Sequence, residues 1–277
     1  DLHLKIWQAA RLHGKRPSEE AEGVMKIPYI SKTTSIRGLA AVLFAAPLFP
    51  GSAAILLQEG FETDGEDVRY TVTDSFSDGD ADYFIRTDGA AGAWNLPAYS
   101  GYAGNWFWAA EDTITDNNPS GLTYIDFTGV PLDSVGTVRL SLQAGAGSVD
   151  KYDAVDDFLD VLYRVDGGPW TPALSFQNDG SQYNTHLAPD LDLDGIGEGP
   201  PLSLALDTFS SPDLPVSGSF MDIRIDAVMT SGGESVAFDN LQVVAVPEPA
   251  FASLLIALLG AAVLPLRRTL SSRKEEA

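Results

Sequence analysis

Alternating aspartates mark the stretch of this chain with the clearest chemistry. Asp190, Asp192 and Asp194 are separated by single leucines, and Gly195 follows directly. Carboxylates at alternate positions ahead of a glycine match positions 1, 3, 5 and 6 of a calcium-binding loop, because hard cations prefer oxygen ligands and glycine allows a sharp turn. Glu198 stands at the ninth position, where its carboxylate can add one more oxygen. The pattern predicts a bound Ca²⁺.

This stretch departs from an EF-hand at its twelfth position, where Pro201 replaces the bidentate glutamate, and no helical pattern flanks it. The prediction is therefore a calcium-loop-like turn, and the alternative is an acidic loop exposed to water. A second alternation, Asp78, Asp80 and Asp82, has the same ligand spacing without further support. A denser acidic run over 150–160 is interpreted as a solvated face with at most one ligand in it.

Groups for covalent or acid–base catalysis are sparse. The chain has no cysteine and three histidines, of which only His186 lies within residues 55–245. A Cys/His dyad is thereby excluded, and a histidine-based zinc site lacks a second histidine. No Gly-x-Ser-x-Gly motif presents a serine nucleophile, and carboxylate pairs of the glycosidase kind are too abundant here to be informative. The sequence predicts a protein that is not an enzyme, with a hydrolase as the least favoured alternative.

Aromatic side chains gather in one segment. Trp94, Tyr99 and Tyr102 lie among glycines and asparagines. Aromatic rings stack on sugar rings, and amide or carboxylate groups nearby bond to hydroxyls, so these three residues are candidates for glycan binding. The alternative is that the segment belongs to the core. That alternative is favoured for Trp106 and Trp108, which would share one face of a strand.

The charge of the central segment is strongly negative. Residues 55–245 hold 32 of the 39 acidic residues but only 6 of the 17 Lys and Arg residues, which leaves a formal charge near −26. Such a surface repels nucleic acids and anionic lipids, so a nucleic-acid partner is not expected. Because disulfides are excluded, we expect a hydrophobic core and structural Ca²⁺ to stabilise the fold.

Apolar and polar residues alternate with a period of two along the central segment. This pattern predicts strands at 69–73, 123–127, 137–142, 158–165 and 220–226, among others. Asp-Gly, Gly-Gly and Ser-Gly pairs separate these runs and indicate turns. Nine or ten strands are expected and no amphipathic helix. The predicted class is all-β, a two-sheet jelly-roll β-sandwich over residues 55–245.

The N-terminal residues carry an export signal. Basic residues follow Met25, then an apolar stretch over 38–49, and then the small residues Gly51-Ser52-Ala53-Ala54. These are the parts of a secretory signal peptide spanning 25–54, with cleavage after Ala54. The expected partners are a secretion translocon and signal peptidase. Residues 1–24 are polar and are interpreted as an extension upstream of the true start.

The C-terminal residues 246–277 carry a second signal. Pro247-Glu248-Pro249 holds the chain extended, an uncharged run over 250–266 follows, and Arg267-Arg268 closes it. As a helix, this run would measure roughly 25 Å, close to the thickness of a bilayer core. The order of parts resembles the PEP-CTERM sorting signal of Gram-negative bacteria. The resemblance implies transient anchoring in the cytoplasmic membrane, removal of the tail by an exosortase-type protease, and final localisation at the cell surface or outside the cell.

The edges of the central segment resemble those of secreted jelly rolls, including carbohydrate-binding modules and MAM-like domains. The opening residues are Gly60-Phe61-Glu62 and the closing ones Phe238-Asp239-Asn240-Leu241. In such jelly rolls the first and last strands often meet at a structural Ca²⁺. The resemblance therefore implies Glu62 and Asp239 as carboxylate ligands, completed by backbone carbonyls. The alternative is that Asp239 caps a turn and Glu62 is exposed.

These patterns together predict a secreted, calcium-stabilised structural or adhesive protein of an extracellular matrix or biofilm. A surface lectin, a carbohydrate-binding module that contacts an exopolysaccharide or another glycan, is the alternative function.

Overall fold

The computed structural model describes residues 53–247, except 74, 79–80, 91–94 and 155. Within these ranges all 16 regular elements are strands and there is no helix, which confirms the all-β prediction. None of the described residues forms a helix that is long and apolar enough to cross a membrane. The expected span at 250–266 and residues 25–52 of the expected signal peptide fall outside the described ranges.

The larger sheet has eight strands, and β16 and β7 lie at its centre. Its spatial order is β13 (Asp207–Ser210), β7 (Thr137–Ala146), β16 (Ser235–Ala245), β5 (Phe107–Glu111), β4 (Tyr83–Thr87) and β3 (Phe76–Ser77), while β1 (Ala54–Glu59) pairs with β16 and β14 (Leu214–Pro215) with β7. All of these pairings are antiparallel.

The second sheet has six strands, also antiparallel. Its order is β12 (Leu187–Pro189), β10 (Thr171–Asn178), β9 (Phe158–Val165), β15 (Phe220–Val228), β6 (Thr123–Pro131) and β2 (Thr71–Val72). A small ladder of β8 (Tyr152–Asp153) and β11 (Asn184–Thr185) lies apart from both sheets. The longer strands fall where the alternation predicts them. The sequence estimate of nine or ten was too low because several strands have only two or three residues.

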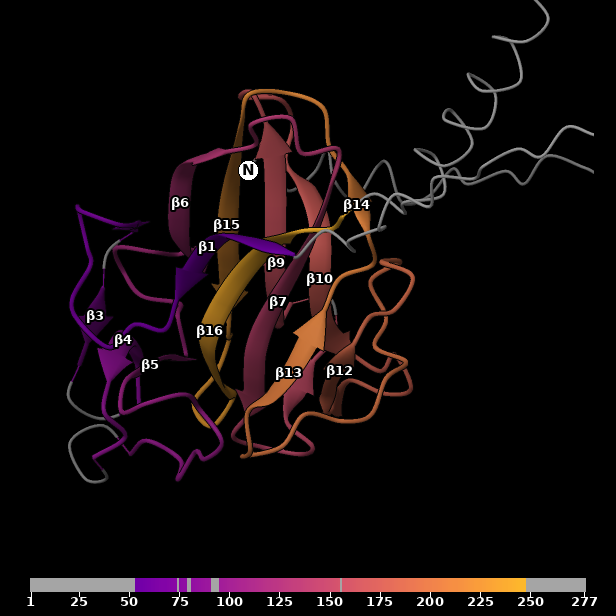
Figure 1. The fold of residues 1–277 in the computed structure, drawn as a ribbon. Helices are drawn as coiled ribbons and strands as arrows, with labels where there is room; N and C mark the ends of the chain where they lie inside the picture. Colours follow the sequence, from indigo (N-terminus) through magenta and orange to yellow (C-terminus); the bar gives the residue numbers. More distant parts are fainter. Residues whose placement is uncertain (1–52, 74, 79–80, 91–94, 155, 248–277) are drawn as a thin grey trace, which may run out of the picture. The chain divides into compact units, whose positions relative to one another are not determined.

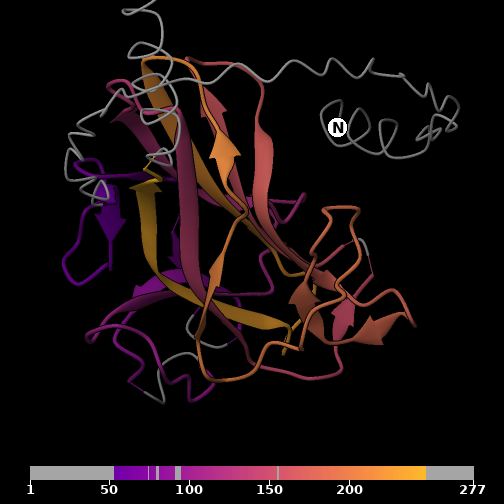
Figure 2. The same cartoon turned by 45° about the vertical axis from the view of Figure 1, so that its right-hand side comes forward.

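The two sheets form a β-sandwich with one main core between them (Figures 1 and 2). In β15 the inward residues Met221, Ile223 and Ile225 are fully buried and alternate with polar residues that face outward. From the larger sheet, Phe238 and Trp108 enter the same core. Alternation of this kind is what a sheet with one buried face requires.

Strand β16 changes partners halfway along its length. Its first part pairs with β5, from Ser235 to Phe238, and its last part pairs with β1, from Leu241 to Ala245. Between the two parts the register against β7 shifts, and Asn240 has a φ of 48°. This irregularity is a β-bulge, which bends the strand and re-aims the side chains beside it. Asp239 stands at the bend.

The ends of the sandwich differ in what they carry. Ala54 of β1 pairs with Ala245 of β16, so the described chain enters and leaves at one end. Ser235, the first residue of β16, pairs with Glu111 at the other end, where long loops connect the sheets. The loops between 179 and 206 gather near that end, at the lower right of Figure 2.

Truncation of Phe238 should destabilise the fold strongly, since its ring is fully buried and lies 6.2 Å from that of Phe61. We expect Phe238→Ala to lower the free energy of unfolding by about 3–5 kcal/mol in urea denaturation. The matched control is Phe220→Ala, because Phe220 is 53% exposed, and its loss should stay below about 0.5 kcal/mol. Equal losses in the two variants would contradict the core described above.

Candidate functional site

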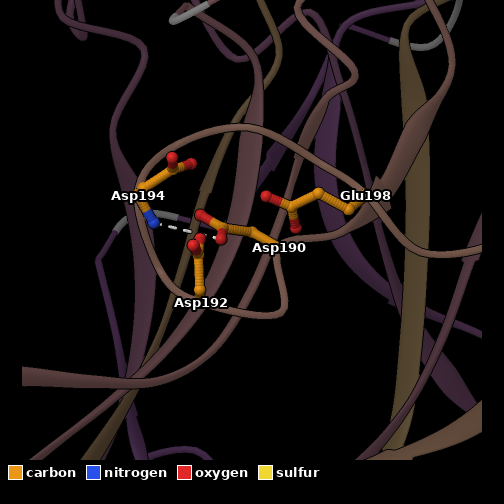
Figure 3. A group of neighbouring side chains, drawn as sticks. All are labelled: Asp190, Asp192, Asp194 and Glu198. Carbon is orange, nitrogen blue, oxygen red and sulfur yellow. Dashed lines mark hydrogen bonds between the residues drawn. The ribbon is translucent and has the colours of Figure 1, made fainter.

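The predicted aspartate loop begins where β12 ends. The Asp190 amide donates to the Ser175 carbonyl of β10 (2.9 Å), and this bond fixes the start of the loop. The Asp190 side chain is 6% exposed and points into the turn, where it accepts a hydrogen bond from the Asp194 amide (3.1 Å, Figure 3). It accepts a second bond from the Gly195 amide (2.7 Å). Leu193 and Gly195 have positive φ angles, which the tight turn requires.

The loop brings four carboxylates together. Its return limb bonds to Pro189 through the Glu198 amide, and the Glu198 side chain accepts from the Leu191 amide (2.9 Å). One carboxylate oxygen from each of Asp190, Asp192, Asp194 and Glu198 lies within 4.8 Å of the others. Burial is the main cause that raises the pKa of Asp190. A set of oxygen donors without histidine or cysteine matches hard cations such as Ca²⁺.

Glu62 and Asp239 meet at the loop 101–106. Asp239 is fully buried and accepts from the amides of Ala103 (2.7 Å) and Asn240 (2.6 Å). Both Glu62 oxygens lie 3.0 Å from the Asn105 amide. Gly104 has a φ of 74°, a backbone conformation that favours glycine, and an added side chain would also displace the Glu62 carboxylate. The two residues that the jelly-roll resemblance implies are thus joined through one loop.

Glu62 and Asp239 repel each other electrostatically, and among the described residues they belong to no group of three carboxylates that could hold an ion. Burial raises the pKa of Asp239 to about 7, hydrogen bonds from Asn240 and Ala103 oppose that rise, and the nearby charges of Glu62 and Glu59 add to it. A divalent cation would relieve the repulsion between these carboxylates. Two carboxylates do not fill the six to eight oxygen positions of Ca²⁺, so carbonyl oxygens of loop 101–106 would have to complete the set.

The third predicted alternation is only partly described. The Asp82 amide donates to Asp78 Oδ1 (3.2 Å), and the Asp78 amide donates to the Asp82 carbonyl, which closes a turn. Asp80 lies outside the described residues. The charge of Asp82 adds to the burial that raises the pKa of Asp112, so these side chains are neighbours. Among the described residues they form no group of three carboxylates that could hold an ion.

The acidic run over 150–160 is not simply a solvated face. Asp157 is fully buried and Asp160 is 7% exposed, and Asp157 joins Asp153 and Glu234 in a compact group. Asp157 Oδ1 and Glu234 Oε2 both accept from the Thr230 amide, at 2.8 and 3.1 Å. Burial is the main reason that the pKa of Glu234 is raised to about 8. The spacing of aspartates was visible in the sequence, but nothing there linked them to Glu234.

The predicted glycan-binding aromatics are placed differently from what was expected. Tyr99 is 7% exposed, and its hydroxyl donates to Ser235 Oγ (3.0 Å), so its ring is not an open stacking platform. The Tyr102 ring packs on Phe107 with 4.5 Å between ring centres. Trp94 lies outside the described residues. Trp108 is a core residue, as the alternative held, and Trp106 stacks under the Arg86 guanidinium at 4.0 Å.

His186 does not form a catalytic triad. Its Nε2 lies 3.6 Å from Asp179 Oδ2, and the Asp179 side chain also accepts from the hydroxyls of Ser181 (2.8 Å) and Thr185 (2.9 Å). The serine therefore donates to the carboxylate and not to the imidazole, which is the reverse of what nucleophile activation needs.

Of the predicted sorting residues, only Pro247 is described. It is exposed, two residues after the end of β16. Glu248, Pro249, Arg267 and Arg268 lie outside the described residues.

Comparisons with known proteins return similar folds at low identity. No protein-family model matches the sequence, and no curated protein matches it. The chain is similar to the K3 cleaved adhesin domain of Lys-gingipain from Porphyromonas gingivalis, with 13% identity over 70% of this chain and 99% of that one and a TM-score of 0.40.

Two other similar structures differ in their chemistry. One is a Stig cyclase from Fischerella sp. TAU, with 13% identity over 72% of this chain and 100% of that one and a TM-score of 0.40. The other holds the CBM22-1 and GH10 modules of xylanase 10B from Clostridium thermocellum, with 7% identity over 70% of this chain and 29% of that one and a TM-score of 0.36. Likenesses this distant assign no activity, so the fold class rests on the sheets described above.

Calcium should raise the melting temperature more than magnesium at equal ionic strength. An ion that binds only the folded state stabilises it, by about 2.7 kcal/mol at a hundredfold excess over Kd, whereas Mg²⁺ demands octahedral geometry and keeps its water. Scanning calorimetry of Asp192→Asn and Asp239→Asn assigns the increment to the loop or to the Glu62–Asp239 pair. Exposed Asp116 supplies the charge-matched control, Asp116→Asn. Equal shifts of the melting temperature with Ca²⁺ and Mg²⁺ in every variant would show that these carboxylates bind no specific ion and form only a solvated surface.

A further buried carboxyl provides a pH test away from these groups. Asp226 on β15 is 9% exposed, and burial raises its pKa to about 8, although Arg224 opposes the rise. The folded state therefore holds this proton more tightly than the unfolded chain does. The associated stability is present below about pH 4 and is lost as the pH rises through about 8.

Asp226→Asn should remove this pH dependence. For one proton, the free energy of unfolding falls by up to about 1.4 kcal/mol per pH unit in this window. Urea denaturation between pH 5 and 9 should show a shallower decline in the variant than in the parent chain. The exposed control Asp116→Asn should leave the slope unchanged. Parallel slopes in Asp226→Asn and the parent would mean that Asp226 is ionised in the fold at neutral pH.

Proposed function

We propose that this chain is an exported, non-enzymatic structural or adhesive protein of an extracellular matrix or biofilm, built on a jelly-roll β-sandwich. The proposal rests on the bonds that the described carboxylates make to backbone amides. Carboxylates from distant segments converge on loop amides and hold the loops in place, as Asp239 and Glu62 hold 101–106. His186, the one histidine of the described residues, lies against Asp179, whose carboxylate accepts the bond from the Ser181 hydroxyl, so no Ser–His pair forms there. A rigid, highly acidic module of this kind is suited to binding rather than turnover.

Calcium fits this proposal as a structural ion. The aspartate loop supplies four carboxylates, and the Glu62–Asp239 pair joins the end of β1 to the bend of β16. Extracellular calcium sites generally bind weakly, with Kd values on the order of 10⁻⁴–10⁻³ M. Bound ions would neutralise part of a formal charge near −26 and stiffen the loops of the sandwich.

The sorting route is supported by the ordered motif at the C-terminus. Pro247, the one residue of the motif that the structure describes, is exposed two residues after the last strand, as recognition by a protease would require. The end of the sandwich at Ala54 and Ala245 would then face the cytoplasmic membrane while the tail is attached. The long loops at the opposite end, including the Asp153–Asp157–Glu234 group, would face away from it.

Processing provides the direct test of this route. In a host that carries an exosortase, surface-exposed protein should lack the residues after about Pro249, and Glu248→Ala should stay in the membrane with its tail intact. Intact-mass spectrometry of the cell-surface and membrane fractions distinguishes these forms. Glu66→Ala serves as the control for the loss of one carboxylate. Surface-exposed protein that still carries Arg267-Arg268 would refute the sorting proposal.

A surface lectin is the second candidate function. It is favoured by one observation, an ordered group of aromatic, arginine and hydroxyl-bonding side chains on the outer face of the six-stranded sheet.

A further inference from the structure

The outer face of the six-stranded sheet carries a mixed group of aromatic, basic, acidic and uncharged polar side chains. Alternation in β6, β15, β9 and β10, which lie side by side in Figure 1, turns one set of residues away from the core. This outer-face group consists of Tyr124, Asp126, Asp160, Arg164, Ser175, Gln177, Asp222, Arg224 and Asp226, with Trp170 from the turn before β10. The strand register places Asp226 between Tyr124 and Asp160.

Two arginines and two aromatic rings form a stacked row across this face. The Arg224 guanidinium lies 3.8 Å from the ring centre of Tyr124 and 4.8 Å from that of Trp170. Arg164 lies 4.4 Å from the same Trp170 ring. Arg224 also makes two bonds to Asp126 (2.6 and 2.7 Å), and Arg164 makes one to Asp222 (2.8 Å). The row is therefore held rigidly, and each cation is already paired with an anion.

A hydrogen-bonded patch adjoins the row. The Ser175 hydroxyl donates to Asp160 Oδ1 (2.6 Å), and the Gln177 amide donates to Ser175 Oγ (2.9 Å). Asp226 is nine-tenths buried beside them, yet its Oδ1 accepts no hydrogen bond, and Arg224 Nε stands 3.8 Å away. A buried carboxyl oxygen without a hydrogen bond is uncommon in a folded protein and calls for a partner. Because burial raises its pKa to about 8, this carboxyl can donate as well as accept at neutral pH.

We propose that this outer-face group is a binding site for a neutral glycan chain. A sugar ring would lie against the half-buried Trp170, and its hydroxyls would bond to the Asp226 carboxyl and to the N–H groups of Arg164 and Arg224 that make no bond to Asp222 or Asp126. Aromatic side chains beside a few convergent polar groups are the usual composition of such sites. The inference rests on the proposed adhesive function and names the class of molecule to which the module adheres.

Charge selects a neutral ligand over a charged one. A domain with a formal charge near −26 would repel an anionic polymer. The two arginines of the row do not offset this repulsion locally, because Asp126 neutralises Arg224 and Asp222 neutralises Arg164. A metal ion is disfavoured at Asp226 because the Arg224 guanidinium stands next to it. Hydroxyl groups avoid both penalties, since each both donates and accepts hydrogen bonds without carrying charge.

The test uses the full chain in detergent on a panel of neutral and acidic polysaccharides. The neutral members are β-glucan, xylan, mannan and galactan, and the acidic ones are alginate and heparin. We expect binding to at least one neutral member, a tenfold or greater loss of affinity in Trp170→Ala, and a comparable loss in Asp226→Leu. Asp226→Asn, which keeps both a donor and an acceptor, should retain binding. Thermal melting confirms that each variant is folded.

Trp106→Ala is the matched control, because Trp106 also stacks on an arginine but lies away from this face, directly before β5 of the other sheet. Its binding should equal that of the parent chain. Binding to acidic members only, no binding by the folded parent chain, or binding that Trp170→Ala and Asp226→Leu leave unchanged would overturn the inference. Retention of the parent chain on the producing cells' matrix is measured in parallel. Retention without glycan binding defeats this inference alone, whereas loss of both defeats the adhesive function as well.

Discussion

The fold depends on a buried carboxylate at a bend in its longest strand. Strand β16 has 11 residues and pairs with β7 on one side and with β5 and then β1 on the other. A straight strand could not serve both partners, so the strand bulges at Asp239 and Asn240. The bulge removes ladder bonds, and the Asp239 side chain replaces them by accepting from the amides of Asn240 and Ala103. A carboxylate placed there is costly unless its charge is balanced.

The excess negative charge at this bend is one instance of an excess of acidic side chains over the whole domain. Glu59, Glu62 and Asp239 gather where the first and last strands meet, and Arg69 compensates only Glu59. The same excess of acid recurs at the aspartate loop and at the Asp153–Asp157–Glu234 group. The Ca²⁺ ions proposed above would relieve the repulsion among these carboxylates. The proposed location outside the cell would supply that ion.

The sequence predicts those features that lie close together along the chain. The period-two alternation locates β6, β7, β9 and β15, and the aspartate loop closes on its own residues, so spacing alone predicts its geometry. Glu234 joins Asp157 only because the connection from β15 of one sheet to β16 of the other lies next to Asp153 and Asp157, and composition does not encode that contact. Burial of Tyr99 depends on tertiary packing, so the sequence left its place in the core or in a glycan site as alternatives. The outer-face row joins Trp170 to Tyr124 across three strands, which only the strand register reveals.

The account turns on whether a cation completes the junction of β1, β16 and loop 101–106. Amide hydrogen exchange, measured by NMR on the folded chain with saturating Ca²⁺ and then with a chelator, tests this directly. The account predicts that removing Ca²⁺ accelerates exchange at the amides of Ala103, Asn105 and Asn240 by tenfold or more, while core amides of β7 and β15 change little. Equal exchange rates at those three amides in both conditions would contradict it, and the bulge would then be stabilised by hydrogen bonds alone.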